Sequence, residues 1–334
     1  MEEAGKVIRG LDATSGRYAN FNRRGKPMRR MKQESLLCLV TVCAAALLTS
    51  ARAYAQQPGG PPASIVFHSA RDGHSNNQIY VMNPDGSNQV RVTNDLASDG
   101  DPDPSSNGQN IVFTSNQPGN NDIFVRDPRG VMTNLTNNLA NDEWARWSPN
   151  GKQIVFDSNR DGGVFEIYVM NADGSGTATR LTDPPVLGRY ASWSPDGKQL
   201  VFRRGIDIYV MSSDGSGTPT PLTSETAPSF AQMPVYSPDG RYIAFMSFRE
   251  GYCSVFRMDA DGGEQVNLTP KDPGDPSTSW CSRAPSWSAD EQEIFFTSFR
   301  PSTSGQSEIF VMNMDGTNVR QLTDDGVSSS PRAR

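Results

Sequence analysis

One unit of sequence returns six times between residue 64 and the end of the chain, and this repetition restricts the possible folds more than any other feature. The units begin at positions 65, 111, 154, 200, 243 and 294 with an apolar segment such as Ile-Val-Phe, and most of them end in Leu-Thr. A repeat of forty-odd residues is typical of the blades of a β-propeller.

Each unit predicts four short antiparallel strands, A to D. Strand B is the Ile-Val-Phe segment, and strand C, such as residues 79–82, is apolar at consecutive positions, which indicates burial on both faces. Ser-Pro-Asp-Gly suits a type I turn from strand A into strand B. The motif that carries this turn reads WSPNGKQ from Trp147, WSPDGKQ from Trp193, YSPDGRY from Tyr236 and WSADEQE from Trp287, whereas Pro104 replaces the aromatic residue in the first junction.

A sheet that is apolar on both faces cannot bury both of them alone, so the units must stack on one another. Closing the stack into a ring also protects the strand edges, and we therefore predict an all-β fold, a six-bladed β-propeller of four-stranded antiparallel blades. The chain enters at strand B, so residues 327–334 are expected to close the first blade as its strand A. This segment lacks the aromatic residue and the hairpin, which predicts a weak seam. An open solenoid is the competing architecture.

The segment before the repeats has the pattern of a secretory signal. Residues 36–48 form an apolar run too short to span a bilayer, with basic residues before it and the small-x-small sequence Ala53-Tyr54-Ala55 after it. We expect a non-structural extension, a cleaved signal peptide, a linker and the propeller, at residues 1–27, 28–55, 56–63 and 64–334. The mature protein is then periplasmic or secreted, with no membrane insertion.

Charge and cysteine usage narrow the possible partners. The whole chain has a net charge of −6, and removal of its basic leader leaves a more acidic remainder. A nucleic-acid partner needs a basic face, so we expect none. The same cleavage leaves Cys253 and Cys281 as the cysteines of the mature chain, and two cysteines in an oxidising compartment usually pair. We expect them to form a disulfide.

The paired motifs W-S-P-D-G-K and I-Y-V-M-N-x-D-G-S resemble those of the TolB-like family of PD40 (WD40-like) repeats over residues 64–326. The resemblance implies a six-bladed propeller with a role in the cell envelope. Family members with an α/β domain before the propeller differ from this chain, in which residues 56–63 separate the expected leader from the first repeat.

We expect no catalytic activity, no cofactor and no metal. A serine hydrolase of the kind that carries such repeats needs a G-x-S-x-G motif, which the chain lacks. His68 and His74 are the histidines of the chain, and with one cysteine pair they leave no zinc site. Alternating acids from Asp99 to Asp103 suggest a calcium loop, but Pro104 stands where an EF-hand has Gly. An acidic connection from strand D to strand A is the simpler interpretation.

The loops on one face of the predicted ring are the best candidates for a binding site. The B-C and D-A loops emerge together and vary in length and sequence, whereas the A-B and C-D turns on the other face are explained by turn formation. Trp, Tyr and Arg dominate binding hot spots. The candidate partner-binding residues on this loop face are Arg71, Asp72, Asp142, Glu143, Trp144, Arg189, Tyr190, Arg249, Trp280 and Arg283.

We therefore predict a non-catalytic, exported and monomeric propeller that binds a protein or peptide of the cell envelope through its loop face. The alternative is a propeller enzyme acting on carbohydrate, a lyase or glycosidase, with carboxylates at the channel mouth. Two facing carboxylates within about 10 Å of each other and open to solvent would favour the enzyme. A rim of aromatic and Arg side chains would favour the partner site.

Overall fold

The chain divides into two compact units, residues 1–58 and 59–334. The computed structural model describes residues 64–71, 76–117, 119–183, 187–271, 281–299 and 307–333. In the first unit it describes two short antiparallel strands, β1 (Gly10–Leu11) and β2 (Tyr18–Ala19). Apart from these strands, the expected extension, signal peptide and linker lie outside the described residues.

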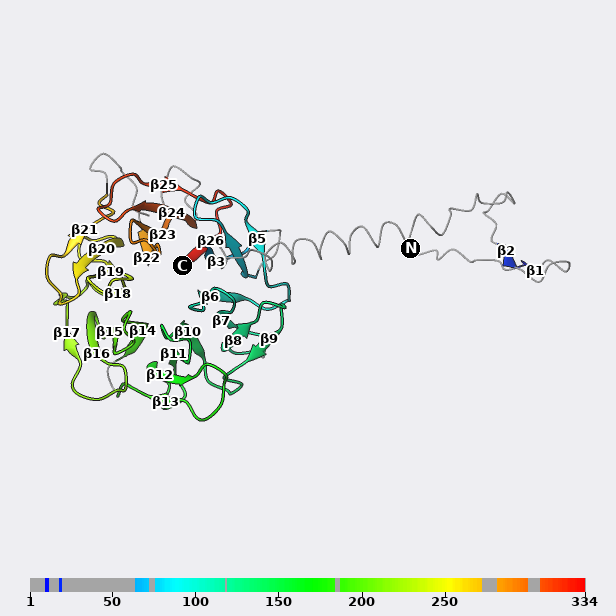
Figure 1. The fold of residues 1–334 in the computed structure, drawn as a ribbon, viewed down its shortest axis with the longest axis horizontal. Coiled ribbons are helices and arrows are strands. Elements are labelled where there is room, and N and C mark those ends of the chain that lie inside the picture. The colour runs from blue at the N-terminus through cyan, green and yellow to red at the C-terminus, as the bar shows by residue number, and fades with distance from the viewer. Residues whose placement is uncertain are drawn as a thin grey trace. The chain divides into compact units, whose positions relative to one another are not determined.

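The second unit is a ring of six antiparallel four-stranded sheets, as the repeats predicted (Figure 1). None of the residues described is helical, and this part of the chain therefore has no helix that meets the length and apolarity needed to cross a membrane. We number the blades 1 to 6 and give the strands of each from the inner to the outer edge, A to D.

Blade 1 contains β26 (Ser328–Ala333), β3 (Ile65–Ser69), β4 (Gln78–Met82) and β5 (Val90–Arg91). Blade 2 contains β6 (Asp99–Pro104), β7 (Ile111–Ser115), β8 (Asp122–Arg126) and β9 (Met132–Asn134). Blade 3 contains β10 (Asp142–Trp147), β11 (Gln153–Ser158), β12 (Glu166–Asn171) and β13 (Thr179–Arg180).

Blade 4 contains β14 (Gly188–Trp193), β15 (Gln199–Arg204), β16 (Asp207–Ser212) and β17 (Thr220–Pro221). Blade 5 contains β18 (Ala231–Tyr236), β19 (Tyr242–Ser247), β20 (Ser254–Asp259) and β21 (Val266–Asn267). Blade 6 contains β22 (Cys281–Trp287), β23 (Glu293–Phe299), β24 (Ser307–Asn313) and β25 (Arg320–Gln321).

The C-terminal strand closes the ring. β26 pairs antiparallel with β3, with Ser329 opposite His68 and Ala333 opposite Ile65, so the expected origin of the missing strand A is confirmed. In Figure 1 the red β26 lies beside the blue-green β3 at the inner edge of blade 1. Ala333 occupies the position that an aromatic residue fills at the end of β10, β14, β18 and β22. The weakness of this seam stays a prediction.

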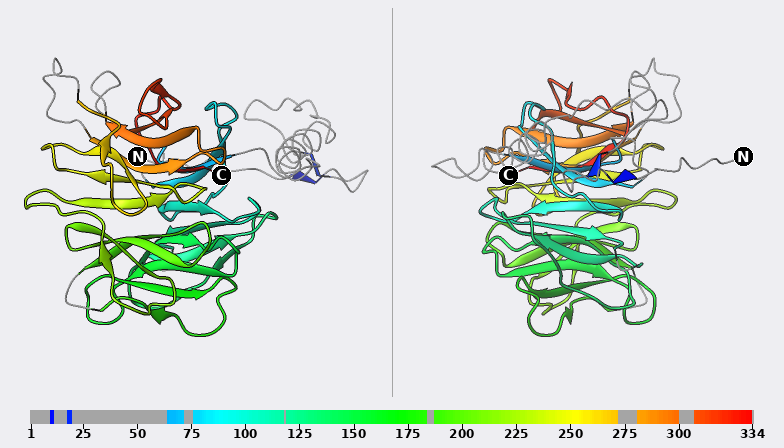
Figure 2. Two further views of the ribbon diagram at one scale, coloured as in Figure 1. Left: turned by 60° about the vertical axis from the view of Figure 1, so that its left-hand side comes forward. Right: turned by 90° about the vertical axis from the view of Figure 1, so that its right-hand side faces the viewer.

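Six hydrophobic clusters hold the ring together, and each of them joins two neighbouring blades. In blade 5 the side chain of Phe245 packs in a cluster with Val201 of blade 4, whereas the adjacent Ala244 packs in the next cluster with Phe296 of blade 6. Successive side chains of a strand point to opposite faces, so both faces of the sheet are covered by different neighbours. This is the burial that the consecutive apolar residues predicted, and Figure 2 shows the blades packed face to face.

The Ser-Pro-Asp-Gly motif forms the expected turn between strands A and B. Ser194 Oγ donates a hydrogen bond to Asp196 at 2.6 Å and accepts one from the backbone N–H of Gln199 at 2.9 Å. Gly197 has a φ of 72°, a conformation that costs glycine little. The motif is therefore a turn whose side chains and backbone satisfy one another.

The Thr that lies two residues after strand D has a structural role in every blade. Its hydroxyl accepts a hydrogen bond of 2.9 Å from the N–H of the second or third residue of strand C, as Thr182 does from Ile167 in blade 3. The Thr182 hydroxyl also donates to the buried Glu166 carboxylate. This hydrogen bond links the segment after strand D to strand C, beyond the last backbone pairing of the two strands. It explains why the Thr of Leu-Thr returns in the repeats.

Thr182→Val removes this hydroxyl while keeping the shape of the side chain. It leaves the Ile167 N–H and the Glu166 carboxylate without a partner in a buried site, so we expect the free energy of unfolding to fall by about 1–3 kcal/mol. Urea denaturation measures the change. Thr179→Val is the matched control in the exposed strand β13, and an equal effect of the two substitutions would contradict the role of the hydroxyl.

Candidate functional site

The inner strand of every blade carries a β-bulge at the centre of the ring. The pairing of strands A and B shifts register there, and the residue at the bulge has a positive φ between 51° and 61°. Non-glycine residues seldom adopt this conformation, so the surrounding structure must hold it. The bulge residues are Asp101, Trp144, Tyr190, Met233, Ala284 and Ser330.

A side chain of the preceding blade binds the bulge N–H at four of the six interfaces. The acceptors are His68 Nδ1 at 3.2 Å, Thr114 Oγ1 at 3.3 Å, Asp157 at 3.0 and 3.1 Å and Thr297 Oγ1 at 2.9 Å. Each of them lies three residues after the Ile that begins the apolar segment of strand B. Arg203 and Met246 occupy this position in blades 4 and 5, and neither offers a strong acceptor. The inner ring is therefore linked by polar contacts as well as by apolar packing.

The structure brings five candidate residues to the loop-face end of the inner strands. Glu143, Arg189 and Arg283 occupy the position just before the bulge in blades 3, 4 and 6, and Trp144 and Tyr190 are bulge residues. We call the group formed by Glu143, Trp144, Asp157, Arg189 and Tyr190 the rim cluster.

Arg189 is the centre of the rim cluster. Its guanidinium donates to the Asp157 carboxylate at 3.2 Å, forms an ion pair with Glu143 and lies 4.1 Å from the centre of the Phe165 ring. The Glu143 carboxylate also accepts a hydrogen bond of 2.8 Å from Asn121. One cation therefore holds carboxylates from blade 3 in fixed positions, and its side chain remains 17% exposed at the rim.

Two aromatic rings complete the rim cluster. The Trp144 and Tyr190 rings meet edge to face, with centroids 4.7 Å apart and planes at 88°. This geometry is favourable for an aromatic pair, and it joins blades 3 and 4 at the inner edge. The Arg146 guanidinium lies 5.6 Å from the centre of the Trp144 ring.

Burial changes the ionisation of Asp157. Its carboxyl is inaccessible to solvent, and burial raises its pKa to about 7 although Arg189 and the Tyr190 N–H favour the charged form. Asp157 and Phe165 were not among the candidates from the sequence, because only the register of strands A and B places them beside Arg189. An Asp that ends the apolar segment IVFD was the available signal.

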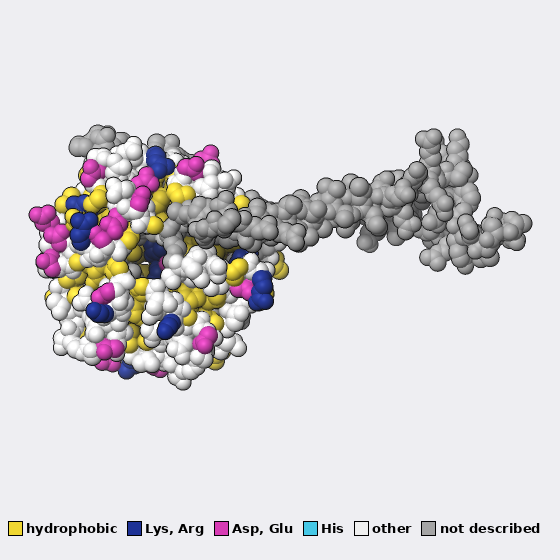
Figure 3. All heavy atoms as spheres, in the orientation of Figure 1, with side chains coloured by type: hydrophobic (Ala, Val, Ile, Leu, Met, Phe, Trp, Pro, Cys, Tyr) yellow, Lys and Arg dark blue, Asp and Glu magenta, His cyan; other side chains and the backbone are white. Residues whose placement is uncertain are grey.

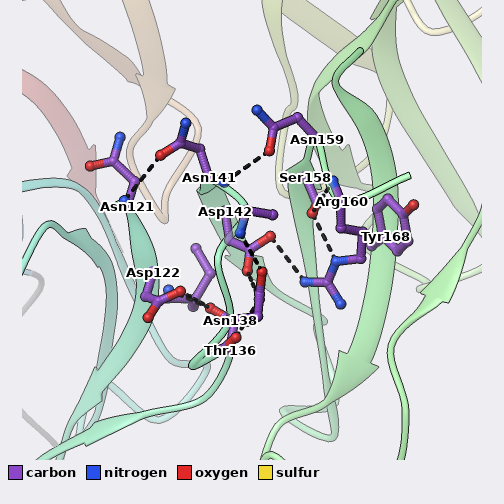
Figure 4. A network of polar contacts seen from close by, with 12 residues as sticks. Asn121, Asp122, Thr136, Asn138, Asn141, Asp142, Ser158, Asn159, Arg160 and Tyr168 are labelled. Atoms are coloured by element: carbon purple, nitrogen blue, oxygen red, sulfur yellow. Dashed lines mark hydrogen bonds and ion pairs between the residues drawn. The ribbon is translucent and has the colours of Figure 1, made fainter. Parts of the chain in front are cut away.

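Arg71, Asp142 and Arg249 lie in contacts internal to a blade. Arg71 pairs with Asp325, Arg160 with Asp142 at 2.9 Å and Arg249 with Glu225 at 2.6 Å, and each guanidinium stacks over aromatic rings of strands B and C. Figure 4 shows this arrangement in blade 3, where Arg160 reaches from Ser158 to Asp142 beside the Tyr168 ring. These ion pairs join the B-C loop to the D-A connection that enters the same blade.

Arg283 lies apart from the rim cluster, and the structure does not describe the last two candidates. The Arg283 guanidinium lies 4.9 Å from the centre of the Phe299 ring, whereas Asp72 and Trp280 lie outside the described residues. A hollow of about 310 Å³ opens beside Arg249 and Glu225 on the loop face, and polar residues surround it. A partner-binding role for the ten candidates stays a prediction.

The acidic run is strand A of blade 2. Asp99–Pro104 forms β6, which pairs with β7, so its interpretation as a connection before strand A was wrong. The repeat fixes the register, and the run falls where other blades have their inner strand. No group of three or more His, Cys, Asp or Glu side chains in the described part of the chain is placed to hold a metal ion.

Cys253 and Cys281 lie side by side on the loop face. The two residues form a parallel bridge in which the Ser282 N–H donates to the Cys253 carbonyl at 2.9 Å. Both are free thiols in the structure, and a hydrogen bond from Cys281 lowers the pKa of Cys253 to about 7. A thiolate attacks sulfur far more readily than a thiol does, so this pair is suited to oxidation.

We expect the mature protein from an oxidising compartment to contain the Cys253–Cys281 disulfide. Thiol titration of the denatured protein should find no reactive thiol before reduction and two after it, and Cys253→Ser should show one without reduction. The crosslink should also stabilise the fold by about 2–4 kcal/mol against reductant. Two reactive thiols in the oxidised protein would contradict the prediction.

His68 provides a test of the polar links in the inner ring. Burial lowers its pKa below the ordinary value of 6.5, with a smaller opposing effect of Asp101, and the neutral ring accepts the Asp101 N–H. Because the unfolded chain binds the proton more readily, stability is fully present above pH 6.5 and is lost as the pH falls through the lowered pKa.

His68→Gln keeps an acceptor but does not titrate. The stability of the wild type relative to this variant should therefore decrease as the pH falls below about 6.5, and urea denaturation at several pH values measures it. NMR titration of the His68 ring should give a pKa below 6.5. A constant difference in stability between pH values, or a higher pKa, would contradict the buried neutral ring.

Comparisons with known proteins support the fold. No protein-family model matches the chain, so the PD40 label rests on the repeat motifs alone. The uncharacterized protein Atu1656 of Agrobacterium fabrum (strain C58 / ATCC 33970) is 31% identical over 89 residues, which are 27% of this chain and 27% of that protein. The match thus spans about a quarter of that relative.

Solved structures of TolB proteins share the propeller. A candidate TolB protein from Agrobacterium tumefaciens aligns with a TM-score of 0.62 and 23% identity over 80% of this chain and 91% of its own. TolB from Acinetobacter baumannii aligns with 0.66 and 20% over 97% and 78%. Oligogalacturonate lyase from Vibrio parahaemolyticus aligns with 0.53 and 12% over 78% and 74%. The chain therefore has a TolB-like propeller fold, which these identities establish without a function.

Proposed function

We propose that this protein is a non-catalytic, exported propeller that binds a protein or peptide of the cell envelope through its loop face. The mature chain acts in the periplasm or outside the cell. The rim cluster is the observation that carries the proposal, because it presents aromatic rings and an Arg at the inner edge of two neighbouring blades. Rigid aromatic and Arg anchors are the usual centres of protein interfaces.

The state of the carboxylates favours binding over the carbohydrate enzyme. A glycosidase or lyase of the expected kind needs two facing carboxylates open to solvent, one of which exchanges a proton with the substrate. At the rim, Asp157 is fully buried and both Asp157 and Glu143 are engaged by Arg189. These acids are arranged to position Arg189, and a substrate cannot reach Asp157 without displacing it.

Surface charge supports a protein partner rather than a polyanion. On the face drawn in Figure 3, Lys and Arg side chains are scattered among acidic, apolar and uncharged ones outside the grey atoms. A nucleic acid or a strongly anionic polymer needs a continuous basic surface. The resemblance of the repeats to the TolB-like family supports the cell envelope as the place where the partner is found.

The proposal is tested by capture from an envelope extract with the chain from Gln56 onward as bait. Arg189→Gln should reduce recovery of the captured partner at least about tenfold, because it removes the central cation of the rim cluster. Arg241→Gln is the control, since Arg241 lies in a turn on the opposite face with its side chain 68% exposed. Thermal unfolding of both variants verifies that they are folded.

Two outcomes contradict the proposal. Equal capture by the Arg189 and Arg241 variants would remove the rim cluster from the interface. Failure to enrich any envelope protein, together with release of unsaturated or reducing sugar from a uronate polymer, would favour the enzyme instead.

A further inference from the structure

A second hollow opens where the inner strands end, on the face of the A-B turns. It has a volume of about 260 Å³. Its walls include the aromatic residues that end four inner strands and two arginines that lie one position before that end. These residues are Trp147, Trp193, Tyr236, Trp287, Arg146 and Arg332. Turn formation explains the Ser-Pro-Asp-Gly part of the motif, and packing between blades explains the burial of Trp193, Tyr236 and Trp287. Neither explains the two cations that lie among the aromatic side chains.

Among the residues described, the two arginines are buried in a hollow whose walls also carry one acidic residue, Asp103. Arg146 is 7% and Arg332 6% exposed, and neither forms an ion pair there. Backbone carbonyls hold them, because Arg146 Nη1 donates to Ala145 at 2.7 Å and Arg332 Nη1 to Pro285 at 2.7 Å. A carbonyl carries only a partial charge, and the attraction of Asp103 and Asp101 offsets only part of the effect of burial and of Arg146 on Arg332, so the positive charge is incompletely compensated.

Two hydrogen-bond donors in the walls of this hollow are buried and have no acceptor among the described residues. They are Arg332 Nε and the indole N–H of Trp147. The corresponding indoles of Trp193 and Trp287 each donate to a backbone carbonyl at 3.3 Å. An unmet buried donor is costly, so a ligand that supplies acceptors gains from both.

The arginines also act on each other. Burial and, to a smaller extent, the charge of Arg146 lower the pKa of Arg332 to about 9, while Asp103 and Asp101 oppose the change. Both guanidinium groups project from the same strand position, in blades 1 and 3, on either side of blade 2. Asp103 holds this strand position in blade 2, so the hollow has two cations and one acid in its walls, and a further anion is attracted by the excess of positive charge.

We propose that the turn-face hollow is a binding site for an organic carboxylate. A planar guanidinium donates two parallel hydrogen bonds to a carboxylate, and the indole walls accept an apolar or ring-shaped body next to it. The hollow is smaller than a typical drug-sized pocket, so the ligand is a small molecule or the carboxylate end of a longer chain. The hollow opens on the face opposite the rim cluster, although Arg146 also contacts the Trp144 ring of that cluster, and the proposal does not depend on the proposed partner.

Benzoate and benzamide are the matched probes, because they share a ring and differ in charge. The fluorescence of the Trp residues lining the hollow reports binding to the folded mature protein. We expect saturable quenching by benzoate at millimolar concentration or below, and affinity for benzamide at least about tenfold lower. Equal affinity for the two probes, or no saturable change with benzoate, would overturn the proposal.

Substitution of the two arginines tests whether benzoate binds in the turn-face hollow. Arg146→Gln and Arg332→Gln should each weaken benzoate binding at least about tenfold, and the turn-face control Arg241→Gln should leave it unchanged. Thermal unfolding identifies a variant that fails to fold, and the comparison of the two probes on the wild type stands without either. Unchanged benzoate affinity in both folded arginine variants would overturn the assignment.

A second pair of probes distinguishes the two sources of the carboxylate. N-acetyl-alanyl-phenylalanine ends in a free carboxylate, and its C-terminal amide is the control. Tighter binding of the free peptide than of benzoate indicates the end of a protein chain as ligand. Binding of benzoate without binding of the peptide indicates a small metabolite, and both results support a carboxylate site.

Discussion

The contact between the faces of neighbouring blades is the interaction on which the rest of the structure depends. Each sheet is apolar on both sides, and each of the six hydrophobic clusters takes side chains from two blades. No blade has a complete core of its own, so the stability of one blade requires the next. A ring satisfies this requirement for every blade, and the pairing of β26 with β3 brings the two ends of the propeller sequence into one sheet.

The inner strands of all six blades pair with strand B in the same register, with a bulge at the same place. Equivalent residues therefore meet at each of the two ends of the channel, and the two ends carry different side chains. The bulges are tied to the preceding blade at four interfaces, so the positions before and after them recur around the axis. At the loop face they carry Arg189 between two carboxylates, and at the turn face they carry Arg146 and Arg332 beneath aromatic rings.

The sequence alone predicts the blades well, because strand, turn and burial all leave local signals. Consecutive apolar residues mark strand C, Ser-Pro-Asp-Gly marks the turn, and the strand missing before residue 65 points to the C-terminal segment. The bulges leave no such signal, because their residues share neither size nor charge. The burial of Asp157 beside Arg189 follows from the bulge and was equally invisible.

The sequence predicts only part of the candidate site, because residue type alone does not show which side chains meet in the folded chain. Aromatic and Arg residues in variable loops lead to Trp144, Arg189 and Tyr190, but the same criterion selects Arg71 and Arg249. Their acidic partners are Asp325 for Arg71, near the other end of the chain, and Glu225 for Arg249, 24 residues before it, so their role within a blade appears only in three dimensions. The turn-face hollow leaves little signal in the sequence, because turn formation accounts for most of the repeated motif and the closure of the ring brings its aromatic residues together.

Removal of residues 327–334 tests the closed ring most directly. The truncated chain should unfold in urea as one transition with a clearly lower midpoint than the complete protein, followed by Trp fluorescence, because β3 becomes an unpaired edge and the cluster between blades 6 and 1 is opened. An unchanged midpoint would show that each blade is stable without a closed circle, and it would contradict the account.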